Sequence, residues 1–314
     1  MDEDIEVVPF TEALIEGYLD LAERDDSTDP LYGEQSSREE RRERLNRQVS
    51  SGITRSHLVA LKGDFLVGNA KANLPPKCGE EMEVATLSMM VHEEHRREGI
   101  GTHLLNRLCE ELRREDIEWI EIGALDSWKP WREFLKKNGF ESYERCADVA
   151  LPSDAHVPDF PVAGVSIRPI RIPAERDTVI SIYNTERSKD LPMACAVEPG
   201  QPAWWEMEPW ASDFEPESLL VAFEDDSQGM VGYVSSGILP DSQGLVHYVD
   251  VKERTLGKGL RKALLSRAVQ WLRGKGASEI HSRVHVGYRG EEKLFEDLGF
   301  IVKQTATVWR RETK

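Results

Sequence analysis

The chain has 314 residues, 39% of them hydrophobic and 31% charged, which is typical of a folded globular protein long enough for two domains. Its formal net charge of -17 would repel a phosphate backbone over most of the surface, so nucleic acid is not expected as a partner. No apolar run approaches the roughly 18 residues that cross a bilayer, and the acidic start Met1-Asp2-Glu3-Asp4 is unlike a basic secretory signal, so we expect no membrane partner and a cytoplasmic location.

The first half of the chain predicts alternating strands and helices. After an N-terminal strand and one or two helices comes a hairpin at 59–68, whose apolar residues alternate around a Gly-Asp turn. A further strand ends at Val91, a glycine-containing loop follows at 96–101, and another strand lies at 119–122. The helix after the loop carries a core-forming stripe of leucines at helical spacing: Leu104, Leu105, Leu108 and Leu112.

Three prolines separate this half from the next. Pro152, Pro158 and Pro161 can neither extend a helix nor lie inside a sheet. The sequence therefore predicts an N-terminal domain at 1–153, a proline-rich linker at 154–163 and a C-terminal domain at 164–314.

The second half repeats the order of the first at an offset of about 160 residues. It holds a strand at 165–168, a hairpin between 220 and 233, a loop at 254–259 and a strand at 279–282. The stripe of its main helix is Leu260, Leu264, Ala268 and Leu272. This order predicts an α/β (α+β) fold for each half, with helices flanking a mixed, mostly antiparallel central sheet.

The four cysteines, Cys78, Cys109, Cys146 and Cys195, are widely separated and include no Cys-x-x-Cys pair. This spacing indicates neither a zinc knuckle nor a disulfide framework. We expect the cysteines to be reduced and mostly buried, with no bound metal.

Both halves place an Arg-x-x-Gly-x-Gly loop between a strand and a helix. The N–H groups at a helix start are unpaired and can hold phosphate, glycine lets a diphosphate approach the backbone, and arginine adds positive charge. The alternative is a tight turn in which glycine is needed only for the backbone dihedral angles. Two copies in equivalent positions favour phosphate binding.

With these loops the sequence resembles the GNAT superfamily of N-acetyltransferases, whose signature is a strand ending in valine, an Arg/Gln-x-x-Gly-x-Gly/Ala loop and a helix. Segments 91–101 and 249–259 match this pattern, and 134–140 and 294–300 look like the family's Leu-Tyr-Glu-Lys-Leu-Gly-Phe ending. The resemblance covers nearly the whole chain as a tandem of two GNAT domains, in a layout similar to that of the mycothiol synthases.

The resemblance implies one cofactor, acetyl-coenzyme A (acetyl-CoA). Its pyrophosphate would lie on the loop, and its pantetheine arm would lie between two splayed strands. The resemblance assigns to the cofactor Val91, Arg96, Arg97, Glu98, Gly99, Ile100, Gly101 and Thr102 in the first half, and Val249, Arg254, Thr255, Leu256, Gly257, Lys258, Gly259 and Leu260 in the second.

The usual proton donor of the family is absent. GNAT enzymes often use a tyrosine in the last helix to protonate the departing thiolate, but Leu135 and Phe295 stand at those positions and neither can donate a proton. The proton would then come from another residue or from solvent.

Three other residues are catalytic candidates: His247 and Tyr288 in the second half, and Glu83 on a strand of the first. His247 precedes Val249 by two residues, so strand alternation would put both on one face and could direct His247 into the substrate cleft as the general base. Tyr288 is the candidate acid. The alternative is that His247, an isolated histidine on a strand, is packed in the protein or solvated and has no catalytic role.

A cluster of aromatic and acidic residues marks a candidate acceptor site. Trp204, Trp205, Glu206 and Glu208 lie where the family usually covers its acceptor, and aromatic faces with carboxylates suit a cationic amine. The alternative is that the tryptophans pack a domain junction.

The sequence thus predicts an acyl-CoA-dependent N-acyltransferase that moves acetyl from acetyl-CoA to a primary amine of a small molecule or peptide. We expect both halves to bind cofactor and the second to carry out the chemistry. Two alternatives stay open: one half is a structural or regulatory copy that binds coenzyme A, or the chain is a pseudo-acetyltransferase that serves as a binding module.

Overall fold

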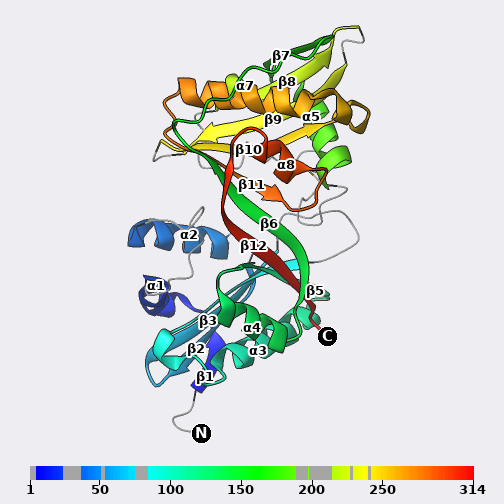
Figure 1. Cartoon of the computed structure of the whole chain (residues 1–314). Helices are drawn as coiled ribbons and strands as arrows, with labels where there is room; N and C mark the ends of the chain where they lie inside the picture. Colours follow the sequence, from blue (N-terminus) through cyan, green and yellow to red (C-terminus); the bar gives the residue numbers. More distant parts are fainter. Residues whose placement is uncertain are drawn as a thin grey trace. The chain divides into compact units, whose positions relative to one another are not determined.

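The computed structural model describes residues 5–23, 37–50, 54–74, 84–188, 197, 214–226, 229–239 and 242–314 (Figure 1). The chain divides into two compact units. We call Met1–Tyr143 with Thr307–Lys314 the N-terminal unit and Glu144–Ala306 the C-terminal unit. Within the described residues, no helix is both long and apolar enough to span a membrane.

The N-terminal unit is built on a mixed sheet with the strand order β1-β2-β3-β4-β5-β12. Its strands are β1 (Ile5–Pro9), β2 (Thr54–Lys62), β3 (Phe65–Asn73), β4 (Val84–Val91), β5 (Trp119–Leu125) and the last residues of β12 (Ile301–Glu312). Its helices are η1 (Glu12–Leu14), α1 (Ile15–Glu23), α2 (Arg38–Ser50), η2 (Glu93–His95), α3 (Ile100–Arg114) and α4 (Lys129–Lys137). Strands β1 to β4 pair antiparallel, and the hairpin predicted at 59–68 is formed by β2 and β3.

Strands β4 and β5 run parallel but pair only at their starts. The register joins Val84–Thr86 to Trp119–Glu121, so the five later residues of β4 lie beyond the paired stretch. A parallel pair that separates in this way leaves backbone groups of β4 available to a ligand.

The predicted leucine stripe of α3 is the core of this unit. Leu104, Leu105, Leu108 and Leu112 are all at most 1% exposed and pack on β2 and β3. Gly68 on β3 permits this packing, because a Cβ there would lie 2.9 Å from Leu104.

The C-terminal unit repeats the arrangement with the strand order β6-β11-β10-β9-β8-β7. Its strands are β6 (Glu141–Leu151, entering from the N-terminal unit), β7 (Val165–Pro169), β8 (Leu219–Glu224), β9 (Met230–Ile238), β10 (Gly244–Val251) and β11 (Ile280–His285). Its helices are α5 (Arg176–Tyr183), the π-helix η3 (Asn184–Ser188), η5 (Pro216–Ser218), η6 (Glu253–Lys258), α7 (Leu260–Gly274) and α8 (Glu291–Glu296).

Two helices cover opposite faces of this second sheet. Leu264 and Leu272 of α7 join a buried cluster with Val249 and Val251 of β10, whereas α5 packs in a separate cluster to which Tyr248 belongs. Alternate residues of β10 thus point to the two helices. Strands β10 and β11 also pair in parallel for only three residues, Gly244–Val246 with Ile280–Ser282.

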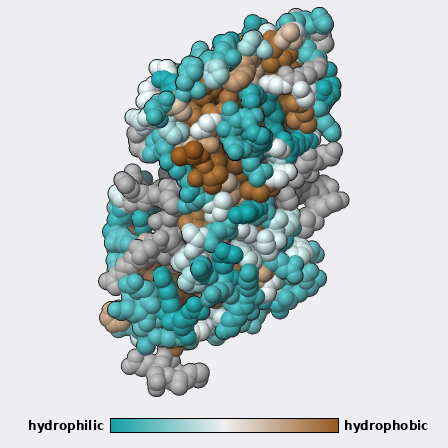
Figure 2. All heavy atoms as spheres, in the orientation of Figure 1, coloured by the Kyte–Doolittle hydropathy of each residue, from teal (hydrophilic) through white to brown (hydrophobic). Residues whose placement is uncertain are grey.

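The mixed, mostly antiparallel fold is confirmed in both halves. The division at 154–163 stays a prediction. The boundaries between the two compact units lie at other points of the chain, before Glu144 and before Thr307. The last residues of the chain fold with the N-terminal unit because Trp309 is buried in its core and Arg310 Nε donates to Glu121 at 2.5 Å. On the face drawn in Figure 2 most side chains are hydrophilic, in keeping with the charged composition.

Candidate functional site

The N-terminal unit contains a cavity of about 600 Å³ between the end of β4, the start of α3 and helix α4. It is lined by residues of three kinds: strand and loop residues Met89, Met90, Val91, His95, Arg96, Arg97, Gly99, Gly101 and Thr102; aromatic and proline side chains Trp128, Pro130, Trp131 and Phe134; and the charged Glu133 and Lys137. The cavity therefore contains the first Arg-x-x-Gly-x-Gly loop.

The backbone conformation of this loop leaves the N-terminus of α3 facing the cavity. Gly99 is the N-cap of α3 with a φ of 90°, and Arg97 has a φ of 73° although it is not glycine. The first N–H groups of an α-helix have no partner within the helix, and Gly101 and Thr102 at the start of α3 both line the cavity. A Cβ on Gly101 would lie 3.2 Å from the Phe134 ring, so the glycine keeps the space between the start of α3 and this ring open.

The cavity gathers positive charge in an acidic protein. Arg96, Arg97 and Lys137 line it, against the single carboxylate of Glu133, which lies 3.8 Å from the exposed Arg97 guanidinium. The Arg96 Nε donates to the Val91 carbonyl at 3.0 Å and so ties the loop to the end of β4. This charge, with the helix N-terminus, suits an anion.

The opposite wall is aromatic. Trp131 and Phe134 of α4 stack with ring centroids 5.0 Å apart, and Trp128 lies 5.7 Å from Trp131. An elongated molecule with an anionic end and an apolar arm fits this arrangement, with the anion at the loop and the arm along β4.

Most first-half residues expected at the cofactor line this cavity: Val91, Arg96, Arg97, Gly99, Gly101 and Thr102. Ile100 instead packs in the core at 2% exposure, and the Glu98 carboxylate lies 3.4 Å from His95 Nδ1. The aromatic wall of α4 is a feature that the sequence analysis missed, although Trp128, Trp131 and Phe134 at helical spacing could have indicated it.

The second loop has the same residue pattern and a different backbone. Residues Glu253–Lys258 form the 3-10 helix η6, and α7 begins only after Gly259, its N-cap, with a φ of 74°. Arg254 makes two hydrogen bonds to the Glu224 carboxylate, at 3.0 and 2.8 Å. Gly257 is exposed, and a Cβ at this position would have no atom within 4 Å.

Several side chains of this loop are occupied by packing. Thr255 is 1% exposed and its hydroxyl donates to the Lys252 carbonyl at 2.6 Å. Leu256 packs against the core, and Val249 and Leu260 are at most 1% exposed. The side chain of Lys258 lies outside the described part of the chain.

His247 occupies a β-bulge. The register of β10 with β9 shifts between Val246 and Tyr248, which leaves His247 as the extra residue. The bulge interrupts the alternation from which we placed His247 on the face of Val249, so alternation no longer fixes its direction. Burial lowers the pKa of His247 to about 4, and the ring is therefore neutral at pH 7.

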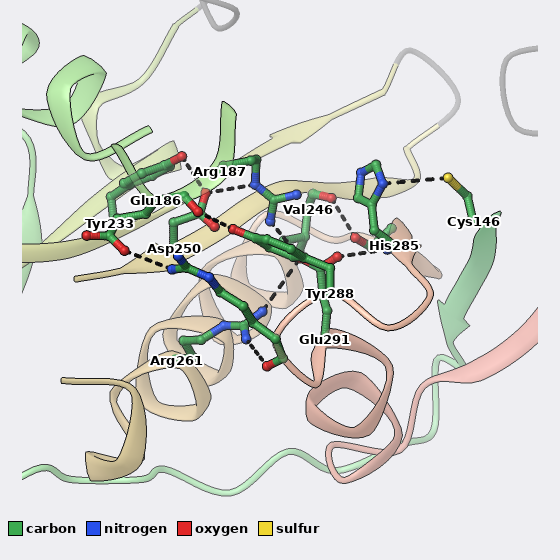
Figure 3. Close-up of polar contacts among 12 residues, drawn as sticks. Cys146, Glu186, Arg187, Tyr233, Val246, Asp250, Arg261, His285, Tyr288 and Glu291 are labelled. Atoms are coloured by element: carbon green, nitrogen blue, oxygen red, sulfur yellow. Dashed lines mark hydrogen bonds and ion pairs between the residues drawn. The ribbon is translucent and has the colours of Figure 1, made fainter. Parts of the chain in front are cut away.

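Tyr288 lies in the loop after β11 and is 6% exposed. Its hydroxyl donates to the Glu186 carbonyl at 2.5 Å (Figure 3), and burial raises its pKa above the ordinary range. Tyr288 is thus a weak acid already bonded to the backbone.

Beside it lies a buried ionic network that the sequence analysis missed (Figure 3). The guanidinium of Arg187 donates to Asp250 at 2.8 Å and to Glu291 at 2.6 Å, and the Tyr233 hydroxyl donates to Asp250 at 2.7 Å. Arg187 is 1% exposed. The four residues come from four different elements, and no local pattern links them.

Five predicted site residues lie outside the described residues: Glu83, Trp204, Trp205, Glu206 and Glu208. Leu135 and Phe295, at the positions of the usual family tyrosine, are 0% and 1% exposed core residues.

Comparison with known proteins relates both halves to one family. Residues 54–142 match the acetyltransferase (GNAT) domain, and residues 180–300 match the acetyltransferase (GNAT) family. Mycothiol acetyltransferase of Streptomyces scabiei is 24% identical over 289 residues, which cover 92% of this chain and 89% of the relative. The enzyme of the same name from Rhodococcus erythropolis is 26% identical and covers 78% of this chain and 80% of its own.

Solved structures share the fold over both halves. A GCN5-related N-acetyltransferase from Sphaerobacter thermophilus superposes with a TM-score of 0.76 at 16% identity, covering 99% of this chain and 96% of its own. A tandem GNAT protein from the clavulanic acid biosynthesis pathway gives 0.65 at 18% identity, with 99% of both chains covered. The two family matches, the paired loops and the repeated sheet together show that this chain is a tandem GNAT acetyltransferase with one GNAT region in each half.

Proposed function

We propose that this acetyltransferase takes acetyl from acetyl-CoA and transfers it to a primary amine of a small molecule or peptide. The observation that carries the cofactor assignment is the cavity of the N-terminal unit, which combines a helix N-terminus, Arg96, Arg97 and Lys137 with an aromatic wall. GNAT enzymes typically use acetyl-CoA. The diphosphate would lie at the loop, and the pantetheine arm would follow Met89–Val91 along β4.

We further propose that the C-terminal unit carries out the transfer. Its loop repeats the first loop in sequence, and β10 separates from β11 just after Val246. The bulged residue His247 follows at once, and β-bulges are over-represented next to active sites, where they redirect a side chain. A thioester lying between these strands would have its carbonyl beside His247.

The pKa of His247 restricts what the residue can do. An ordinary alkylammonium ion has a pKa near 10, so an imidazole with a pKa of about 4 cannot remove its proton to a useful extent. His247 can accept a hydrogen bond from the N–H of a neutral amine while the amine nitrogen attacks the thioester carbonyl. The C–N bond forms, the nitrogen gives up its extra proton to solvent, and the C–S bond breaks. The departing thiolate takes a proton from solvent, because the Tyr288 hydroxyl is bonded to Glu186.

The relatives suggest where to begin the search for the acceptor. Those quoted above are named mycothiol acetyltransferases at about a quarter identity, which supports a small-molecule amine as the first class to test. A cysteinyl amino sugar belongs in that panel beside simple amino sugars, amino acids and peptides.

Cofactor binding can be tested by calorimetric titration of the full chain with acetyl-CoA. We expect two binding events in the natural protein and one in Gly101→Val, whose side chain would enter the cavity beside Phe134. Gly274→Val is the matched control, because a Cβ at that exposed end of α7 would have no atom within 4 Å. Unchanged binding in Gly101→Val would remove the cavity from the proposal.

The site of transfer can be tested by coenzyme A release with the amine panel. We expect His247→Ala to lower kcat by about 10- to 100-fold, the loss of one hydrogen bond, while the affinity for acetyl-CoA stays the same. If Gly101→Val abolishes turnover and His247→Ala does not reduce it, the N-terminal unit is the reactive one and our assignment is wrong.

A further inference from the structure

Three side chains of the C-terminal unit converge on one point outside the sites described so far. Within the described residues, Glu144, Cys146 and His285 form a group of potential metal ligands whose donor atoms all lie within 4.8 Å of one another. The Cys146 sulfur lies 3.7 Å from His285 Nδ1 and 4.0 Å from Glu144 Oε1. Glu144 Oε1 is also in direct contact with His285 Nδ1.

The backbone brings these residues together. Strands β6 and β11 pair antiparallel, and Cys146 is the register partner of His285. Directly opposed side chains have Cβ atoms about 5 Å apart. Glu144 precedes Cys146 by two residues and so shares its face of the strand. All three donors project from the same face of one strand pair, as Figure 3 shows for Cys146 and His285.

Cys146 is buried, Glu144 and His285 are partly buried, and the hydrogen-bonding capacity of the group is incompletely satisfied. Cys146 is 6% exposed, and the side chains of Glu144 and His285 are 8% and 14% exposed. Glu144 Oε2 is buried and has no hydrogen-bond partner among the described residues. A buried carboxylate oxygen without a partner is unfavourable, and a cation would satisfy it.

The next carboxylate on this face gives a contrast. Asp148 is 1% exposed, but Arg283 donates to one of its oxygens at 2.6 Å and Gln304 to the other at 2.7 Å. Both oxygens of Asp148 are therefore occupied by protein donors. Glu144 differs because its partners are themselves metal-binding groups.

We propose that Glu144, Cys146 and His285 bind a divalent transition-metal ion, with Zn²⁺ the best match. One thiolate, one imidazole and one carboxylate form a donor set of the borderline-soft kind that Zn²⁺ accepts, with a fourth position for water. Zinc bonds of about 2.0–2.3 Å at tetrahedral angles put neighbouring donors about 3.3–3.6 Å apart. The distances from the sulfur are close to this spacing, and a rotation of the Glu144 side chain away from His285 makes room for the ion.

The bound ion ties β6 to β11 beside the buried network. The backbone N–H of His285 donates to Glu291 at 2.8 Å, and Glu291 in turn holds Arg187. The metal thus fixes the end of β11 to β6, along the edge of β11 opposite the one that pairs with β10. Its role is structural, and this proposal does not depend on which unit transfers acetyl.

The direct test uses Co²⁺ as a spectroscopic probe on the full, untagged chain after treatment with a chelator and a non-thiol reductant. We expect one Co²⁺ per chain, with thiolate-to-cobalt charge-transfer absorption and the intense visible bands of four-coordinate cobalt. Cys146→Ser should lose the charge-transfer absorption. Cys109→Ala, which removes another buried cysteine, on α3, should keep it. A natural protein without this absorption, or a Cys146→Ser variant that retains it, would overturn the proposal.

Zn²⁺ affinity supplies the second readout, by competition with a chromophoric chelator. Loss of an outer-shell partner costs about 10- to 100-fold in metal affinity, so Glu144→Gln and His285→Gln should each lose at least about 100-fold. Glu141→Gln, an exposed carboxylate at the start of β6, should leave the affinity unchanged. Zn²⁺ should also raise the melting temperature of the natural protein. If a variant fails to fold, the Co²⁺ spectrum of the natural protein still decides the question, and binding of Zn²⁺ too weak to compete with the chelator counts against the site.

Discussion

The guanidinium of Arg254 and the carboxylate of Glu224 form two hydrogen bonds, at 3.0 and 2.8 Å. Arg96 holds the matching place in the first loop, but its Nε donates to the Val91 carbonyl. The two loops also start their helices differently, since the first glycine of the motif caps α3 and the second glycine caps α7. One residue pattern thus supports two backbone conformations, and this difference leads to separate predictions for each loop.

Arg97 should show a conflict between stability and binding. Its φ of 73° is unfavourable for a residue with a Cβ by roughly 1–2 kcal/mol, whereas its charge lies in the cavity. We expect Arg97→Gly to leave the free energy of unfolding equal or higher and to weaken acetyl-CoA binding about 10-fold. Arg97→Ala keeps the strain, so it should bind as weakly without the gain in stability. Denaturant unfolding and calorimetry measure both effects, and a tightly binding Arg97→Gly would refute the charge argument.

The two glycines of the second loop should respond differently to alanine. Gly259 has a φ of 74°, so Gly259→Ala should lower the free energy of unfolding by about 1 kcal/mol. The backbone of Gly257 is not left-handed, and a Cβ there meets no atom within 4 Å, so Gly257→Ala should change it by less than about 0.5 kcal/mol. Urea unfolding of the two variants is the measurement, and equal losses would contradict the observed helix start.

Loss of Arg187 should be severe. Arg187→Met removes the guanidinium partner of Asp250, and both side chains are at most 3% exposed. Breaking a buried pair from one side costs about 3–5 kcal/mol. The double variant Arg187→Met with Asp250→Asn should recover part of this loss, because Asp250 is then uncharged and Glu291 keeps the Arg261 guanidinium 3.6 Å away. Arg254→Ala removes a pair whose arginine is 57% exposed and should cost less than about 1 kcal/mol. Chemical denaturation compares these three variants with the natural protein, and a mild effect of Arg187→Met would show that the network contributes little.

His247 should make the fold sensitive to acid. In the unfolded chain its pKa is about 6.5, whereas burial lowers it to about 4 in the folded protein. Between these values the unfolded chain binds more protons, so the stability contributed by the neutral ring is complete above pH 6.5 and is lost as the pH falls toward 4. His247→Gln has no such titrating group. From pH 7 to pH 4 its free energy of unfolding should fall by up to about 3 kcal/mol less than that of the natural protein. Parallel pH dependences in urea unfolding would mean that the ring is not buried as described.

The local elements of this protein follow from short-range patterns. The leucine stripe at 104–112 and the Gly-Asp turn of the first hairpin specify a helix and a hairpin, because spacing along the chain fixes which residues share a face. The repeated Arg-x-x-Gly-x-Gly loops were enough to indicate the family and the tandem. The sequence also led to the expectation of no metal, since Cys146 and His285 are 139 residues apart and no spacing rule connects them.

The amino-acid sequence by itself determined the helices, the strands, the duplication and the GNAT family, because each depends on periodicity or on residues within a few positions of one another. Only the tertiary structure decided that His247 sits in a bulge, that Arg187 meets Asp250 and that Trp309 completes the core of the other half. The physical reason is that such contacts depend on strand register and chain path, and these are set by the packing of the whole unit.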